Sequence, residues 1–232
     1  MPVQRSPSTS TRGIVHAAAG KDKFSLDRFQ PGPELRPFVE HYWCVRYHVA
    51  SGESYTQTVL SFPCVHLAFE EDDAGRRALV YGIPRRPFVR ELRGAGRVLG
   101  VRFRAEGFFP FWRKDVALLT GRTVAAAEVF GGQAERWMHA VLDADYPVAM
   151  ADAAEAALAK RAPEPDARAD WVSRIVDEVM HDRNVIRVEQ LSQRAGVSAR
   201  HLQRLFHRYV GVTPKWVIKP SAYVAKSAPG VS

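Results

Sequence analysis

Four polar side chains between residues 200 and 207 have the chemistry and the spacing of a surface that reads DNA bases. On a helix they occupy one face, at positions i, i+3, i+4 and i+7: Arg200, Gln203, Arg204 and His207. An arginine can bond both O6 and N7 of guanine, and a glutamine can bond N6 and N7 of adenine. The pattern therefore predicts contact with the major groove of double-stranded DNA.

Three basic residues beside this face are expected to meet the DNA backbone. Arg208, Lys215 and Lys219 can bind phosphates, which adds affinity and salt dependence without choosing a sequence. Taken alone, an arginine-rich helix face is also typical of a merely solvated helix. The residues around the helix are therefore needed to distinguish a DNA-binding face from a solvated one.

Two short helices must position this face. The first is indicated by Leu191 and Ala195, which lie one turn apart. The second carries an apolar stripe of four residues: Leu202, Leu205, Phe206 and Tyr209. Gly196 is expected to end the first helix, because glycine enters the left-handed region without a side-chain clash. Ser198 is a good N-cap for the second helix, and we count it among the DNA-binding residues.

The charge of the chain is concentrated in the same region. The net charge is +8, and a single acid, Glu189, accompanies the basic residues between positions 183 and 219. Two cysteines are too few for a disulfide scaffold, and no apolar run is long enough for a signal peptide or a membrane span. We therefore expect a cytoplasmic protein with a polyanionic partner and no membrane contact.

The N-terminal half has the period of short β-strands. Apolar and polar residues alternate in the runs 43–49, 65–70 and 99–104, which predicts a small antiparallel barrel or sandwich. We interpret residues 81–94 as turns between strands, and the acidic run 70–73 as a solvated turn.

Beyond Pro110 the period becomes helical, with an apolar stripe at 134–142 and an alanine-rich helix at 148–160. Trp171, Ile175 and Val179 indicate a further helix before the recognition module. We expect an α+β protein in five parts: residues 1–23 disordered, 24–162 a β domain with a helical extension, 163–169 a linker, 170–219 an all-α helix-turn-helix module, and 220–232 a frayed tail.

The helical module resembles the first helix-turn-helix of AraC/XylS-type transcriptional regulators along one segment: LSQRAGVSARHLQRLFHRYVGVTPKWVIK. The resemblance implies that Arg200, Gln203 and Arg204 contact bases, and that residues 211–214 form the turn into the next helix. Such regulators carry a second helix-turn-helix. Here we expect Pro220 to interrupt the connecting helix and the residues after it to be too few for another module. Weaker binding to DNA is therefore expected.

The N-terminal half resembles domains of uncharacterised AraC-type proteins along three segments: FQPGPELRPFVEHYWCVRY, FPCVHLAFEED and GVRFRAEGFFPFW. This resemblance implies a cupin-like β domain that binds a small-molecule effector, forms a homodimer, or does both. Six aromatic residues could line a pocket or simply pack the core: Trp43, Tyr47, Phe62, Phe69, Phe103 and Trp112.

Three histidines and two cysteines could in principle catalyse a reaction, but their patterns do not support it. His41, His48 and His66 lack the compact spacing of a cupin metal site, and nothing around Cys44 or Cys64 indicates an activated thiolate. We expect no catalytic residue, no metal and no cofactor, and hence no enzyme. Two hypotheses stay open: a sequence-specific transcriptional regulator of AraC type that responds to an effector, and a ligand-binding or dimerisation module whose truncated C-terminus binds DNA weakly.

Overall fold

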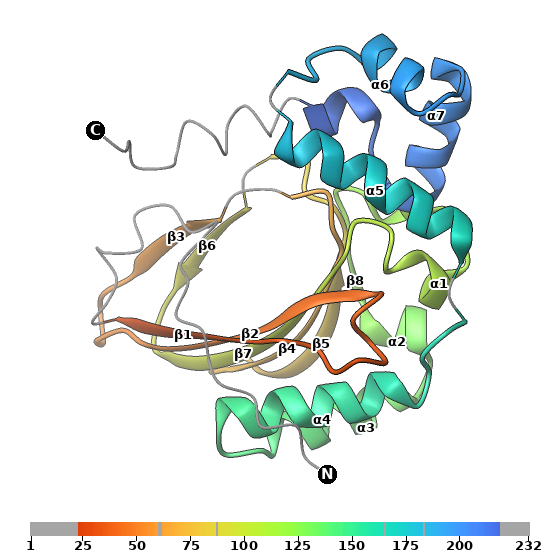
Figure 1. The fold of residues 1–232 in the computed structure, drawn as a ribbon. Helices are drawn as coiled ribbons and strands as arrows, with labels where there is room; N and C mark the ends of the chain where they lie inside the picture. Colours follow the sequence, from red (N-terminus) through yellow and green to blue (C-terminus); the bar gives the residue numbers. More distant parts are fainter. Residues whose placement is uncertain (1–22, 60–61, 87, 165, 183, 219–232) are drawn as a thin grey trace.

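The computed structural model describes residues 23–59, 62–86, 88–164, 166–182 and 184–218. Lys219, the expected tail and nearly all of the segment expected to be disordered lie outside these ranges. Within them, an antiparallel β region is followed by helices (Figure 1), which confirms the expected α+β class.

Six antiparallel strands form one curved sheet. In spatial order they are β1 (Phe24–Phe29), β2 (Val39–His48), β7 (Ala95–Phe103), β4 (His66–Asp72), β5 (Gly75–Tyr81) and β8 (Thr123–Ala125). The strands β3 (Tyr55–Val59) and β6 (Phe88–Leu92) pair with each other and face the concave side of that sheet (Figure 1). The expectation of turns throughout 81–94 was wrong for β6, because all five of its residues pair in register with β3.

Two helices cover the convex face of the large sheet: α3 (Gln133–Leu142) and α4 (Pro147–Ala159) (Figure 1). Cys44, Leu99 and Phe69 lie opposite one another on β2, β7 and β4, so their side chains share this face. All three are buried, and the Cys44 Sγ lies 3.9 Å from the Sδ of Met150 in α4. The apolar sides predicted for 65–70 and 99–104 face the helices. In the run 43–49, the side of Cys44 faces them instead, and the side predicted to be apolar, with Tyr47 and Val49, packs in a separate cluster with Leu92 of β6.

The acidic run corrects a second expectation. Glu70 and Asp72 belong to β4 rather than to a solvated turn, and Glu70 is only 1% exposed. Its carboxylate accepts hydrogen bonds from Arg77 and Arg90, each at 2.9 Å, and from the Tyr81 hydroxyl at 2.6 Å. Burial by itself would raise the pKa of Glu70, but the bonds from Arg90 and Tyr81 hold it below its ordinary value. The negative charge is buried because cations from two neighbouring strands compensate it.

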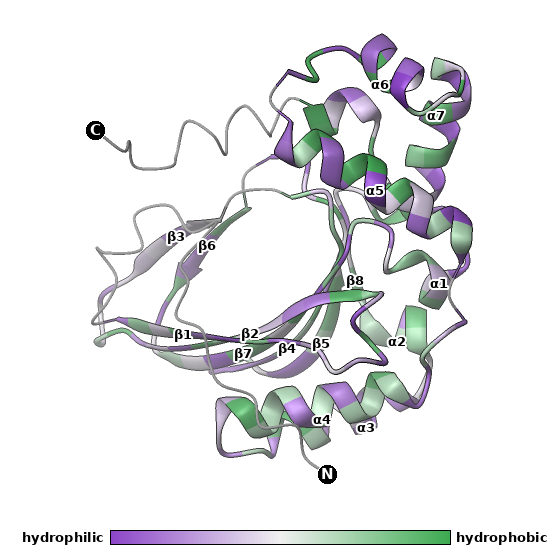
Figure 2. Ribbon diagram, in the orientation of Figure 1, coloured by the Kyte–Doolittle hydropathy of each residue, from purple (hydrophilic) through white to green (hydrophobic). Residues whose placement is uncertain are grey.

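The remaining elements lie toward one end of the sheet: α1 (Phe109–Trp112), the 3₁₀ turn η2 (Val116–Leu119), α2 (Ala126–Phe130), α5 (Ala167–His181), α6 (Val188–Arg194), α7 (Ala199–Leu205) and the π-helical turn η3 (Phe206–Val210). Hydrophobic and hydrophilic residues alternate along α5 and α7 (Figure 2), as expected of helices that bury one face.

The helix α5 begins inside the range expected as a linker. The Asp166 carboxylate accepts hydrogen bonds from the backbone N–H groups of Arg168 at 2.8 Å and Ala169 at 3.2 Å, so it caps the helix. No helix in the described ranges is long and apolar enough to cross a membrane.

Candidate nucleic-acid interface

The turn between α6 and α7 is built as its residues predict. Gly196 follows α6 with a φ of 66°, in the left-handed region that favours glycine. The Ser198 hydroxyl accepts a hydrogen bond from the backbone N–H of His201 at 3.2 Å and caps α7. These two residues set the angle at which α7 leaves the turn.

The apolar stripe of the second helix is confirmed as core. Leu202 and Phe206 are fully buried, and Leu205 and Tyr209 are nearly so. They belong to the same hydrophobic cluster as Leu191 of α6 and the buried face of α5, which is formed by Val172, Ile175, Val176 and Val179. Burying this stripe turns the opposite face of α7 toward solvent.

That opposite face and its continuation into η3 carry the predicted base-reading residues. All of them are exposed: Arg200, Gln203 and Arg204 on α7, and His207 on η3. The side chains of Arg200 and Gln203 make no hydrogen bond to any described residue. A guanidinium nitrogen of Arg204 lies 3.1 Å from the Nδ1 of His201 on the same helix. The structure thus leaves the donors of this face available to a ligand outside the chain.

Arg194, in the same module, forms ion pairs within the protein. One guanidinium nitrogen lies 2.8 Å from the Glu178 carboxylate and 2.7 Å from that of Asp182, and both partners hold the pKa of Arg194 above its ordinary value. This arginine ties α6 to the end of α5. It therefore provides a charge-matched control for the arginines of the α7 face.

The C-terminal end of the α7 face meets the β domain, which sequence reasoning missed. The Nδ1 of His207 lies 3.6 Å from an Asp115 carboxylate oxygen, just before η2. The rings of Phe109 and Tyr209 lie 4.3 Å apart between centroids, and the Arg208 guanidinium lies 5.2 Å from the Phe109 ring. Arg208 is exposed, but its guanidinium lies against α1. Any contact between Arg208 and a DNA phosphate would be made from this position.

The next turn also packs against the β domain. The Thr120 hydroxyl donates a hydrogen bond of 2.6 Å to the carbonyl of Gly211, whose φ is 90°. The Thr213 hydroxyl accepts a bond from the backbone N–H of Trp216 at 3.2 Å and begins the helical residues 214–218. The predicted turn into the next helix is confirmed, and Lys215 is exposed on that helix.

A buried carboxyl group lies at the contact between the β domain and α5. Glu106 is 2% exposed, and one of its oxygens has no hydrogen-bond partner among the described residues. Burial raises the pKa of Glu106 to about 7, and the negative charge of Asp177 on α5 adds to the rise. A hydrogen bond from Ser173, also on α5, and the nearby Arg104 oppose it.

This carboxyl group predicts a pH dependence of stability. Glu106 is harder to ionise in the folded protein, so folding should weaken as the pH rises from 4.5, its ordinary pKa, to about 7, and then level off. Across that window we expect the wild type to lose up to about 3 kcal/mol relative to Glu106→Gln. Urea unfolding of both proteins at a series of pH values measures the difference. Parallel profiles would contradict the assignment.

Of the residues considered for catalysis, Cys44, Cys64 and His41 are buried, His66 is half-buried and His48 is exposed. Burial raises the pKa of Cys44 to about 12 and also raises that of Cys64. Burial and then the charge of Arg102 lower the pKa values of His41 and His66 to about 3, so both rings are neutral. In the described ranges, no three His, Cys, Asp or Glu side chains gather closely enough to hold a metal ion.

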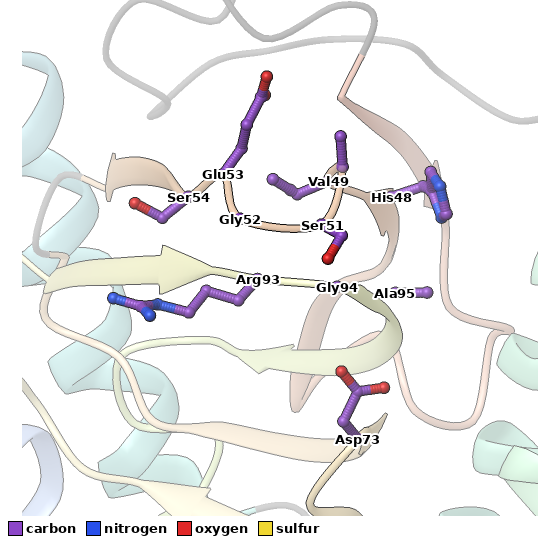
Figure 3. Close-up of a pocket in the computed structure, with 11 residues that line it drawn as sticks. His48, Val49, Ser51, Gly52, Glu53, Ser54, Asp73, Arg93, Gly94 and Ala95 are labelled. Carbon is purple, nitrogen blue, oxygen red and sulfur yellow. The ribbon is translucent and has the colours of Figure 1, made fainter.

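Two of the hollows on the described surface are lined by charged side chains. One, of about 590 Å³, lies between the loops that end β2, β4 and β6, and His48, Glu53, Asp73 and Arg93 are among its lining residues (Figure 3). The other, of about 750 Å³, borders α7 and is lined in part by Trp171, His201 and Arg208. Only the second is adjacent to the predicted DNA-binding face.

Comparison with known families divides the chain in the same way. Residues 180–219 match the model of bacterial regulatory helix-turn-helix proteins of the AraC family, and residues 27–125 match a domain of unknown function (DUF6597). No curated protein and no solved structure matches the chain. The first match contains α6 and α7, and the second contains most of the curved sheet. The AraC-family match supports a DNA-binding regulator of transcription.

Proposed function

We propose that this chain, an AraC-type regulator with an uncharacterised N-terminal domain, reads a specific DNA sequence through the exposed face of α7. The observation that carries the proposal is that Arg200 and Gln203 are exposed and their side-chain donors bond to no described residue, while the opposite side of the helix is buried through Leu202 and Leu205. Exposed side chains on a helix that can each form two hydrogen bonds are complementary to the edges of bases in the major groove.

The residues of the interface would divide into two roles. Arg200, Gln203 and Arg204 would contact base edges, and Lys215 would bind a phosphate from the start of the following helix. Lys219 has the same predicted role but lies outside the described residues. Ser198, at the N-terminus of α7, would position the helix and contact the backbone at its entry into the groove.

Selection from genomic fragments tests the proposal. The full chain, mixed with random genomic DNA at physiological salt, should retain a small set of fragments in a gel shift. Their shared sequence should compete at least about 10³-fold better than unrelated DNA, the lower end for specific regulators. Equal retention of all fragments would contradict sequence-specific reading, and no retention at all would contradict DNA binding.

A ligand-binding or dimerisation module that binds DNA weakly is the second candidate, and the concave face of the sheet favours it. Of the six aromatic residues considered for a pocket, Trp43 and Phe62 are half-buried there, while Phe69 and Phe103 belong to the core. The Arg102 guanidinium lies 4.2 Å from the centre of the Phe62 ring. An effector bound at this face would also make the regulator responsive, so effector-dependent stabilisation without DNA retention would favour this candidate.

A further inference from the structure

We propose that the DNA-binding surface continues from α7 onto the N-terminal domain, where Arg113 and Lys114 bind phosphates beside the major groove. The proposal rests on the proposed function, because it extends the same interface. It makes the domain of unknown function part of the DNA contact as well as a candidate sensor.

The loop that carries these two residues lies at the end of the base-reading face. Arg113 and Lys114 follow α1, and the next residue, Asp115, is the one that approaches His207 to 3.6 Å. His207 stands two turns after Arg200 on the same face of the recognition module. A helix in the major groove approaches the sugar-phosphate backbone where it leaves the groove. The loop is therefore next to the expected path of the phosphates.

The loop is held firmly in that position from both sides. Arg113 ends α1 in the left-handed conformation, with a φ of 55°, and its backbone N–H bonds to the carbonyl of Phe109. On the other side, Val116 is fully buried and lies against Gly211, whose carbonyl accepts the bond from Thr120. Positions fixed before binding lose little conformational entropy when a phosphate is bound.

Arg113 and Lys114, the basic residues of this loop, are exposed, and neither forms an ion pair with any residue in the described ranges. The Lys114 ammonium lies 4.6 Å from the centre of the Trp112 ring, which orients it without neutralising it. By contrast, Arg76 of the same domain is paired with Glu71 and Asp143. Free cations beside an arginine-bearing recognition face fit a polyanion.

Double-stranded DNA is the partner that this position favours. Arg208 of the recognition module lies against Phe109, the residue whose carbonyl accepts the backbone hydrogen bond from Arg113. The two cations thus follow directly on the part of α1 that the module contacts. An acidic protein surface would also attract them, but it would not require them at the end of a base-reading helix. Asp115 is the one acid in the loop, and its charge would oppose a nearby phosphate.

Salt-dependent binding to a mixed-sequence duplex tests the proposal, because phosphate contacts do not depend on sequence. The variant Arg113→Gln/Lys114→Gln should bind roughly tenfold more weakly at low salt. The slope of log K against log salt, measured from about 50 to about 200 mM, should become shallower by up to about 2. Asp115→Asn should instead bind more tightly. Lys160→Gln/Arg161→Gln, an exposed basic pair after α4, is the matched control and should behave as wild type.

The outcomes separate this proposal from the proposed function. If the wild type binds DNA but the Arg113/Lys114 variant keeps its affinity and slope, the extended surface is wrong and α7 alone carries the contact. A loss of binding to an acidic protein with unchanged DNA binding would contradict the extended surface as well. If the wild type binds no DNA, the proposed function itself fails. Should the double variant unfold, Lys114→Gln alone leaves the left-handed backbone of Arg113 untouched and gives half of the expected change in slope.

Discussion

The double variant Arg200→Ala/Arg204→Ala is expected to lose most of its preference for its own DNA site. A good bidentate contact contributes about 1–3 kcal/mol of discrimination between bases, so two contacts that add would contribute about 2–6 kcal/mol. Both side chains are exposed and lie on the solvent side of α7, so the stability of the fold should change little. Competition between the selected site and a scrambled duplex measures the loss.

The control for this experiment is Arg194→Ala. It removes the same kind of charge from the same module, but this arginine is paired with Glu178 and Asp182. It should therefore keep the ratio of specific to non-specific affinity. An equal loss of that ratio in both variants would show that total charge matters, and that the α7 face does not read bases.

Gly211→Ala is expected to disrupt the contact between the recognition module and the β domain. A Cβ at this position would lie 2.8 Å from the Ile83 Cδ1 and 3.0 Å from the Val116 Cγ1, both buried in the β domain. The left-handed backbone adds strain of roughly 1–2 kcal/mol, and overpacking typically adds about 1–3 kcal/mol. We expect a total loss of about 2–5 kcal/mol in the free energy of unfolding.

Gly196→Ala supplies the matched comparison. This glycine also has a positive φ, of 66°, but a Cβ there would meet nothing within 4 Å. It should therefore lose only the backbone contribution. Denaturant unfolding of both variants isolates the cost of the interdomain packing as their difference. Equal losses would mean that the contact between Gly211, Ile83 and Val116 contributes nothing to stability.

The same contact gives the β domain a physical connection to the proposed DNA-binding face. The chain from β5 leads directly to Ile83. Val116 of η2 and Thr120, which follows η2, contact the same turn of the recognition module. A ligand that shifted β5 or η2 would have to move or break these contacts. The DNA affinity of Gly211→Ala therefore also tests whether binding depends on the packing of the recognition module against the β domain. If it does, a module that has lost this packing should bind DNA with altered affinity.

Much of the helix-turn-helix was predictable because its signals are local. Gly196 and Ser198 act through their own backbone and side-chain chemistry, and the apolar stripe from Leu202 to Tyr209 can face only one way on a helix. The same holds for the strands around Leu99 and Phe69, where alternation separates the side packed against the helices from the other. These features depend on residues within a few positions of one another.

Contacts between segments far apart in the sequence could not be predicted from such local patterns. Glu70 belongs to an acidic run typical of a solvated turn, and it is buried because Arg90, twenty residues later and on the other sheet, reaches its carboxylate. Likewise, nothing near Glu106 or Gly211 in the sequence indicates that α5 and the β domain close over them.

The polar character of the α7 face could thus be predicted from its residue types and spacing. The segments of the β domain that lie beside this face could not. His207 and Arg208 are residue types typical of an unobstructed DNA-binding surface. The fold nevertheless brings Asp115 close to His207 and Phe109 close to Arg208. The reason is physical. Helical periodicity decides which side chains share a face, but the packing of Tyr209, Gly211 and Val116 decides what else lies beside that face.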